Sequence, residues 1–145
     1  MLPGAAARTV AARALLLEEF LAAETDAGRL SLPLRSTPAK ALLHGHCHQK
    51  AFDAMGAVEK VLRLVPGLDV ATVQSSCCGM AGAFGYQAET YDVSMKMAEL
   101  SLAPAVRAAP QDALIVADGT SCRQQIEHAT GREARHVARI LHAAL

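Results

Sequence analysis

Short apolar runs alternate with amphipathic stretches along most of this chain. Three of the runs have the length of β-strands: residues 41–45, 68–73 and 113–117. The last is apolar at every position, as in strands that are buried on both faces of a sheet. A weaker strand is expected near residues 133–136.

Helical spacing of apolar residues predicts a helix after each strand, over about residues 50–64, 89–108, 122–130 and 137–145. The first of these would bury Phe52, Met55, Val58 or Glu59, and Leu62. Pro104 should kink or split the second, and Ser121 with Gln124 resembles a capping box that opens the third.

This order of elements predicts an α/β fold. Strands that alternate with helices form a mainly parallel sheet with right-handed crossovers. We therefore expect a four-stranded sheet with flanking helices in Rossmann-like layering, preceded by an N-terminal helix.

The N-terminal region differs from the rest of the chain. A stripe of apolar residues predicts a helix from about Ala5 to Ala23, with Val10, Leu17 and Leu21 on one side. The polar, proline-marked residues 24–38 then form the only linker candidate. We expect two parts, residues 1–38 as helix and linker and residues 39–145 as a cysteine-rich α/β domain.

Composition limits the function classes. The formal net charge is +0, with 14 basic and 14 acidic residues, and aromatic residues make up 3%. A nucleic-acid-binding surface usually needs a basic patch, so this partner is set aside. No apolar run approaches the ~20 residues of a membrane span, and the N-terminus lacks the apolar core of a signal peptide. We expect a cytoplasmic protein.

The four cysteines are the main candidates for chemistry. Cys47, the adjacent pair Cys77 and Cys78, and Cys122 each follow a predicted strand and precede a predicted helix. Ligands of open α/β sheets collect at the carboxyl ends of the strands, so these thiols should meet. Disulfides are rare in the cytoplasm, and the set therefore indicates metal or redox chemistry.

Other residues near the cysteines could support such a centre. Lys50 and Arg123 could offset the charge of several thiolates, and Gly79 would let the backbone pass close to a bulky cluster. His46, His48 and His136 are further candidate ligands, or hydrogen-bonding neighbours of the ligands.

Three strings carry a family resemblance: residues 44–51 (HGHCHQKA), 76–86 (SCCGMAGAFGY) and 117–126 (ADGTSCRQQI). In this order they resemble the cysteine-rich CCG domain. That domain occurs in a subunit of heterodisulfide reductase, in the iron-sulfur subunits of glycolate oxidase and anaerobic glycerol-3-phosphate dehydrogenase, and in the C-terminal iron-sulfur region of FAD-linked oxidases. The likeness to the last group is greatest.

The resemblance implies an electron-transfer domain or subunit of a flavin-linked oxidoreductase that acts on a 2-hydroxy acid of the lactate or glycolate type. FAD would be bound by a partner dehydrogenase domain or subunit, and ferredoxin-like clusters would carry electrons between the two. The chain itself would supply no catalytic residue. Through its partners it could lie at the inner face of the membrane.

The fullest form of the family motif has a fifth thiol, but Gly119 stands at that position here. Four thiols fit a 4Fe-4S cluster held by Cys47, Cys77, Cys78 and Cys122. Two alternatives stay open. One is a zinc-binding structural or docking module, and the other is a thiol-disulfide redox protein that uses Cys77, Cys78 or Cys122.

Overall fold

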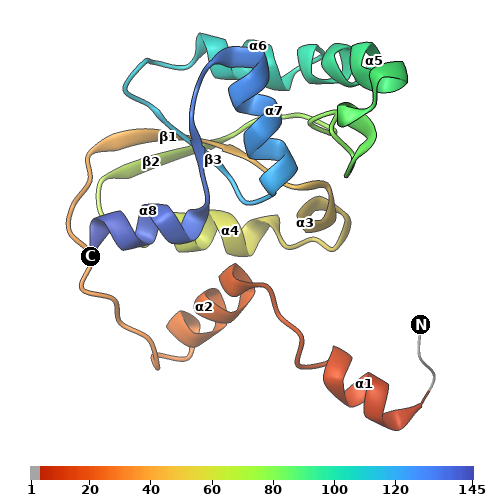
Figure 1. Ribbon diagram of the computed structural model, residues 1–145. Coiled ribbons are helices and arrows are strands. Elements are labelled where there is room, and N and C mark those ends of the chain that lie inside the picture. Colours follow the sequence, from red (N-terminus) through yellow and green to blue (C-terminus); the bar gives the residue numbers. More distant parts are fainter. Residues whose placement is uncertain (1–3) are drawn as a thin grey trace.

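The structure, a computed structural model, describes residues 4–145 and has a four-stranded sheet at its centre (Figure 1). The strands are β1 (Ala39–His44), β2 (Leu68–Thr72), β3 (Leu114–Ala117) and β4 (Ala134–Arg135), in the order β2-β1-β3-β4. Every neighbouring pair is parallel. The predicted α/β fold with a parallel four-stranded sheet is therefore confirmed.

Helices cover both faces of the sheet (Figure 1). In chain order they are α1 (Ala5–Ala11), α2 (Leu17–Asp26), α3 (Cys47–Ala51), α4 (Met55–Leu62), α5 (Ala88–Glu99), α6 (Leu102–Ala108), α7 (Thr120–Thr130) and α8 (Val137–Ala144), with a short 3-10 turn, η1 (Phe84–Tyr86). Helices α4 and α8 lie on one face, with α2 outside them, whereas α6 and α7 lie on the other.

Two apolar clusters divide the core along these layers. The first joins α4 and α8 to the sheet through residues such as Val58, Leu62 and Ile140. The second joins α6 and α7 to the opposite face through Leu102 and Ile126, and it includes Cys78 and Cys122. The candidate centre is thus continuous with the core on the α6–α7 side.

The strand register brings the carboxyl ends of the three long strands together. Leu43 of β1 is aligned with Thr72 of β2, and His44 is aligned with Ala117 of β3. All three strands therefore end within one residue of these aligned pairs. The loops that follow must therefore begin side by side.

The N-terminal helix differs from the expectation. Two helices, α1 and α2, replace the single helix over residues 5–23, and most of the predicted apolar stripe faces outward: Val10 is 69% and Leu17 44% exposed, whereas Leu21 packs against the core. Helix α2 instead buries Glu18 and Ala22. The predicted stripe is therefore wrong for Val10 and Leu17, because α2 packs against α4 with the face that carries Leu21 and Ala22.

The helix expected over residues 50–64 is also divided. Helix α3 ends at Ala51 with Phe52 as its C-cap, and Asp53 takes a left-handed backbone conformation with φ of 57° before α4 begins. Phe52 is therefore carried outward and is 78% exposed, which contradicts its predicted core position. Val58 and Leu62 are fully buried, as expected.

The helix expected over residues 89–108 splits, but not at its proline. The break falls between α5 and α6, where Ser101 precedes the first residue of α6. Pro104 lies in the first turn of α6, where a missing backbone N–H breaks no helical hydrogen bond. The predicted split is confirmed, and its position lies three residues earlier.

Helix α7 also differs from the expectation. It begins at Thr120 with Gly119 as N-cap, and no side chain caps it, so the predicted capping box of Ser121 and Gln124 is wrong. A capping box occurs instead at α3, where His46 Nδ1 accepts from the His48 N–H and Gln49 Oε1 accepts from the His46 N–H.

The segment that joins α2 to β1 is held at two points. The Arg35 N–H donates to the carbonyl of Ala144 at 2.6 Å, and the Thr37 N–H donates to the carbonyl of Pro66 at 2.8 Å. Residues 35–37 therefore run along the edge of the domain beside the end of α8.

One arginine organises the turn between α6 and β3. The guanidinium of Arg132 donates to five backbone carbonyls between residues 106 and 113, the shortest at 2.7 Å to Ala113. Because these carbonyls extend from α6 to the residue directly before β3, the Arg132 side chain holds the whole turn in one conformation.

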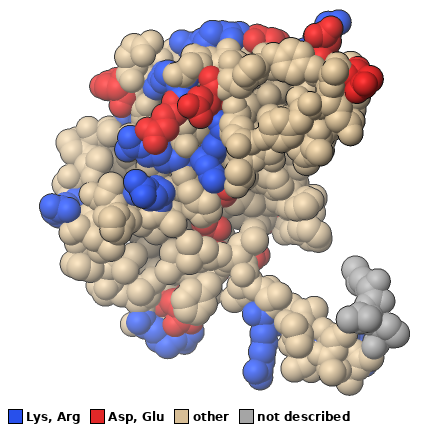
Figure 2. Space-filling view, viewed as in Figure 1, with Lys and Arg blue, Asp and Glu red and all other residues tan. Residues whose placement is uncertain are grey.

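The surface in Figure 2 shows basic and acidic side chains interspersed, with broad uncharged areas between them. This agrees with the equal totals of the two charge types. Within residues 4–145, every helix is too short or too polar to cross a membrane.

The contrast between Phe52 and Leu62 gives a test of the fold. Leu62→Ala should lower the free energy of unfolding by about 2–5 kcal/mol because it opens a cavity in the α4–α8 core. Phe52→Ala should change it by less than about 0.5 kcal/mol because the ring is exposed. Urea unfolding followed by circular dichroism measures both, and equal losses would contradict the helix break at Asp53.

Candidate metal centre

The structure places the four cysteines in the three loops that follow β1, β2 and β3. Cys47 is the first residue of α3, Cys77 and Cys78 lie in the loop after β2, and Cys122 lies in the first turn of α7. All four are free thiols. They stand at the carboxyl edge of the sheet, where the register aligns the strand ends.

The thiols interact in pairs across these loops. The Cys47 thiol interacts with that of Cys77, and the Cys78 thiol interacts with that of Cys122. Among the described residues, the ligand atoms of Cys78 and Cys122 lie within 4.8 Å of one another and of a His44 nitrogen, and Cys47 and Cys77 are not part of that group. The thiols therefore gather at one edge of the sheet as an inner and an outer pair.

The two pairs differ in burial. Cys78 and Cys122 are 2% and 1% exposed and belong to the α6–α7 core, whereas Cys47 and Cys77 are partly exposed. One side of the cluster is thus enclosed by apolar residues and the other side reaches the surface.

In the buried pair, Cys78 and Cys122, the two thiols differ in pKa. The hydrogen bond from Cys122, with further bonds from His44 and the Met80 backbone, lowers the pKa of Cys78 to about 4. The same interaction raises the pKa of Cys122, and burial raises it further. The pair therefore favours one thiolate, on Cys78, which is the form of cysteine that binds metals.

The outer pair is different, because burial is the largest effect on Cys47. Desolvation raises its pKa, and the hydrogen bond with Cys77 adds to this, whereas Lys50 lowers it. Cys47 therefore remains a thiol unless a cation compensates for its charge.

His44, which lies beside the candidate ligands His46 and His48 in the sequence, is a further member of the cluster. Its ring is 1% exposed, and its nitrogen, the Cys78 sulfur and the Cys122 sulfur all lie within 4.8 Å of one another. Nδ1 bonds to Ser75 Oγ at 2.9 Å, and Nε2 is buried without an oxygen or nitrogen partner. A signal existed, because His44 is the last residue of a buried strand.

Gly79 is required by its backbone conformation and by a close contact with α5. Its φ of 92° belongs to the left-handed region, and a Cβ there would lie 2.2 Å from the Ser94 carbonyl oxygen. The glycine therefore lets the cysteine loop pass close to the backbone of α5.

Lys50 and Arg123 are held mainly by backbone carbonyls. Lys50 Nζ donates to the carbonyls of Ser75 and Ser76 and so ties α3 to the cysteine loop. Arg123 donates to the carbonyls of Ala117 and Asp118, at 3.2 and 2.6 Å, and fixes the turn into α7. The positive charge of Lys50 also lowers the pKa of the Cys47 thiol.

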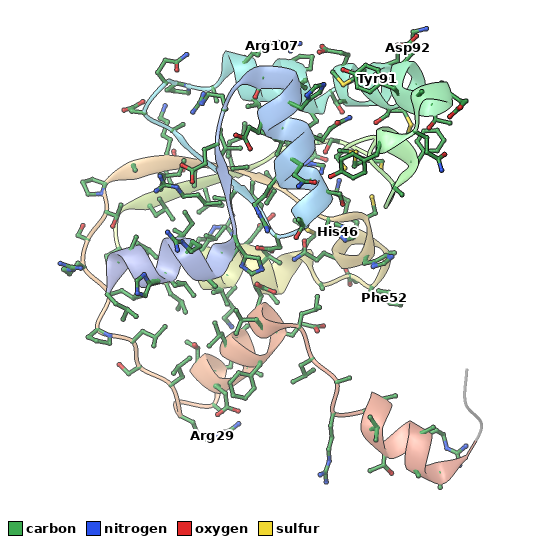
Figure 3. All side chains as sticks on the ribbon, in the orientation of Figure 1. Arg29, His46, Phe52, Tyr91, Asp92 and Arg107 are labelled. Atoms are coloured by element: carbon green, nitrogen blue, oxygen red, sulfur yellow. The ribbon has the colours of Figure 1, made fainter. Side chains whose placement is uncertain are left out.

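His46 occupies the space next to Gly119. A Cβ on Gly119 would lie 2.4 Å from His46 Cδ2 and 3.0 Å from Cys122 Sγ. Figure 3 shows His46 at the beginning of α3, near the start of α7. Burial and the nearby His48 lower the pKa of His46, so the ring favours its neutral form. His46 thus fills the volume that a side chain at position 119 would need.

The two other candidate histidines lie away from the cluster of sulfur atoms. His48 is exposed, with its ring 6.5 Å from that of Phe52. His136 caps α8 through a bond from the Ala138 N–H to Nδ1, and it faces Asp118. The structure brings neither of them together with Cys78 and Cys122.

Comparison with known proteins adds two relatives from Escherichia coli K12. Over 132 residues the chain is 32% identical to one subunit of anaerobic glycerol-3-phosphate dehydrogenase, and the match covers 90% of this chain and 32% of that subunit. It is 30% identical over 129 residues to D-2-hydroxyglutarate dehydrogenase, covering 88% of this chain and 12% of that protein.

The D-2-hydroxyglutarate dehydrogenase of Pseudomonas putida KT2440 is 36% identical over 70 residues, which is 48% of this chain and 7% of that protein. No protein-family model matches the chain, and no solved structure matches it. The chain spans about a third of the length of the glycerol-3-phosphate dehydrogenase relative and a smaller part of the 2-hydroxyglutarate enzymes. It is therefore similar to one region of larger oxidoreductases.

Proposed function

We propose that this chain is an iron-sulfur electron-transfer domain, in which Cys47, Cys77, Cys78 and Cys122 hold a 4Fe-4S cluster. The observation that carries the proposal is the meeting of four free thiols from three loops at one edge of the sheet. Cysteine thiolates are the usual ligands of iron-sulfur clusters.

The surroundings of the thiols fit such a group. Buried apolar residues, among them Met80, Leu102 and Ile126, exclude water on the inner side. Lys50 and the N-terminal ends of α3 and α7 supply positive charge where several thiolates would gather. When bound, the cluster would accept and release single electrons, and its potential would depend on these charges and on burial.

The relatives support a role within a flavin-linked dehydrogenase. Their names refer to the oxidation of glycerol 3-phosphate and of a 2-hydroxy acid, D-2-hydroxyglutarate. We infer that a partner domain or subunit binds FAD and oxidises a 2-hydroxy acid, and that ferredoxin-like clusters connect it to this centre. In this arrangement residues 39–145, which contain all four thiols, form the electron-transfer domain.

We infer that this domain works in the cytoplasm, as the sequence indicates, and that any attachment to the inner face of the membrane comes through its partner subunits.

Iron binding gives the direct test. The chain purified without oxygen, or reconstituted with iron and sulfide, should be brown and contain about four iron and four sulfide ions. Cys78→Ser should lower the iron content by at least half, because it removes the thiol with the lowered pKa. Metal analysis and electron paramagnetic resonance of the reduced protein measure both.

Ser76→Ala is the matched control for this experiment. Its side chain is exposed in the same loop, and its carbonyl, which accepts from Lys50, is retained. It should keep the full iron content. A colourless, iron-free chain after anaerobic reconstitution would reject the proposal, whether or not zinc is present.

The space beside Gly119 gives a second test. Gly119→Cys alone should destabilise the fold by about 1–3 kcal/mol, because its Cβ would clash with His46. His46→Ser, which keeps an N-cap side chain for α3, should largely relieve the clash. Urea unfolding of the two single variants and the double variant gives the coupling between the sites. Additive effects would show that His46 does not occupy the position of a fifth thiol.

A zinc site is the second candidate, and His44 favours it. Zinc ligands at about 2.0–2.3 Å from the ion stand roughly 3.3–3.8 Å apart in a tetrahedron. The nitrogen of His44 and the sulfur atoms of Cys78 and Cys122 lie within 4.8 Å of one another. A structural or docking module would then hold one zinc ion through these groups and one further thiol.

His44→Ala distinguishes the two candidates. If zinc binds through His44, this variant should lose at least about tenfold in zinc affinity and should no longer be stabilised by the metal. If four thiols hold a cluster, it should keep its iron content and change only in reduction potential. Competition with a chromophoric chelator measures the first outcome, and iron analysis measures the second.

A further inference from the structure

A second group of ligand-type side chains lies beside the cysteine cluster. Glu18 of α2, Asp118 after β3 and His136 before α8 each offer one atom, and these three atoms lie within 4.8 Å of one another. They line a hollow of about 290 Å³ that also contacts His46 and Gly119. Three separate parts of the chain therefore converge here.

Glu18 is unusual because its carboxylate is buried without sufficient partners. The residue is 3% exposed, and its Oε1 has no hydrogen-bond partner. Burial raises the pKa of this carboxyl, and the nearby Asp118 raises it further. A buried carboxylate normally pairs with a cation or coordinates a metal. A cation bound at Glu18 Oε1 would compensate for the burial of this oxygen.

Asp118 is held in place by the surrounding structure. Its Oδ1 accepts from the Val137 N–H at 2.9 Å, and its Oδ2 accepts from Gln49 Nε2 at 2.7 Å. These bonds leave a further lone pair on each oxygen. The carboxylate is therefore oriented in the way that hydrogen-bonding neighbours orient metal ligands.

The charges of this group are not balanced by basic side chains. Among residues 4–145, no lysine or arginine forms an ion pair with Glu18 or Asp118. The nearest basic group is the His136 ring, whose Nδ1 lies 3.4 Å from Asp118 Oδ1. That nitrogen already accepts from the Ala138 N–H.

We propose that Glu18, Asp118 and His136 bind one divalent first-row transition-metal ion, with Glu18 Oε1 as the ligand supplied by α2. Two carboxylates and one imidazole form an oxygen-rich set that suits a harder ion such as Mn²⁺, whereas the cysteine cluster selects softer ions. The ion would compete with the Ala138 N–H for His136 Nδ1, so binding should be reversible rather than very tight.

This site would link the N-terminal segment to the edge of the sheet. Helix α2 would be fastened to the turn after β3 and to the start of α8, in addition to its apolar contact through Ala22. The inference is independent of the proposed iron-sulfur function, because it involves none of the four thiols.

Titration of the full chain with Mn²⁺ tests the inference. Electron paramagnetic resonance of free Mn²⁺ should show one ion bound per chain. Glu18→Gln should weaken binding by about tenfold or more. Glu19→Gln, which removes the same charge from the next residue of α2, should change it by less than about twofold, since charges near the protein surface are screened.

Two further variants separate folding and thiol effects from binding. His136→Asn keeps an acceptor for the Ala138 N–H and should also weaken binding. Cys47→Ser, in the other centre, should leave Mn²⁺ affinity unchanged. At ten times the dissociation constant, Mn²⁺ should raise the Tm of the wild type by roughly 4 °C, with no rise for Glu18→Gln.

Three results would overturn the proposal. They are the absence of Mn²⁺ binding to the wild type, equal affinity in wild type and Glu18→Gln, and loss of Mn²⁺ binding in Cys47→Ser. The last would assign the ion to the thiols. A normal unfolding transition for Glu18→Gln, measured without metal, verifies that the variant is folded.

Discussion

The parallel pairing of β1 with both β2 and β3 is the constraint on which the candidate centre depends. Parallel strands end at the same edge of a sheet, and the register here aligns Leu43 with Thr72 and His44 with Ala117. Three loops that are distant in sequence therefore start next to one another. Without this register, Cys47, the adjacent cysteine pair and Cys122 would not meet.

Local patterns were sufficient to predict the strands and the position of the thiols. Strand β3 is an uninterrupted apolar run, and each cysteine follows a strand, so general rules of parallel sheets place them together. Helix breaks were less predictable. The left-handed turn at Asp53 has no glycine or proline to mark it, and the apolar periodicity continues across it.

Other features depend on neighbours that only the folded chain defines. The exposed Leu17 of α2 and its buried Glu18 follow from which face of the helix meets α4. The sequence of the helix alone does not determine that face. The same is true of the space that His46 fills beside Gly119. Sequence identified the glycine as unusual, but the side chain that takes its volume comes from the loop after β1, which is distant along the chain.

The position of Arg132 has a consequence for the order in which the chain can fold. The carbonyls that it holds lie 19–26 residues before it, beyond the whole of β3 and α7. Local contacts form early because closing a short loop costs less entropy. The turn between α6 and β3 can therefore reach its final shape only after the chain through α7 has docked. This connection should be among the last parts of the sheet edge to become ordered, although it precedes β3 in sequence.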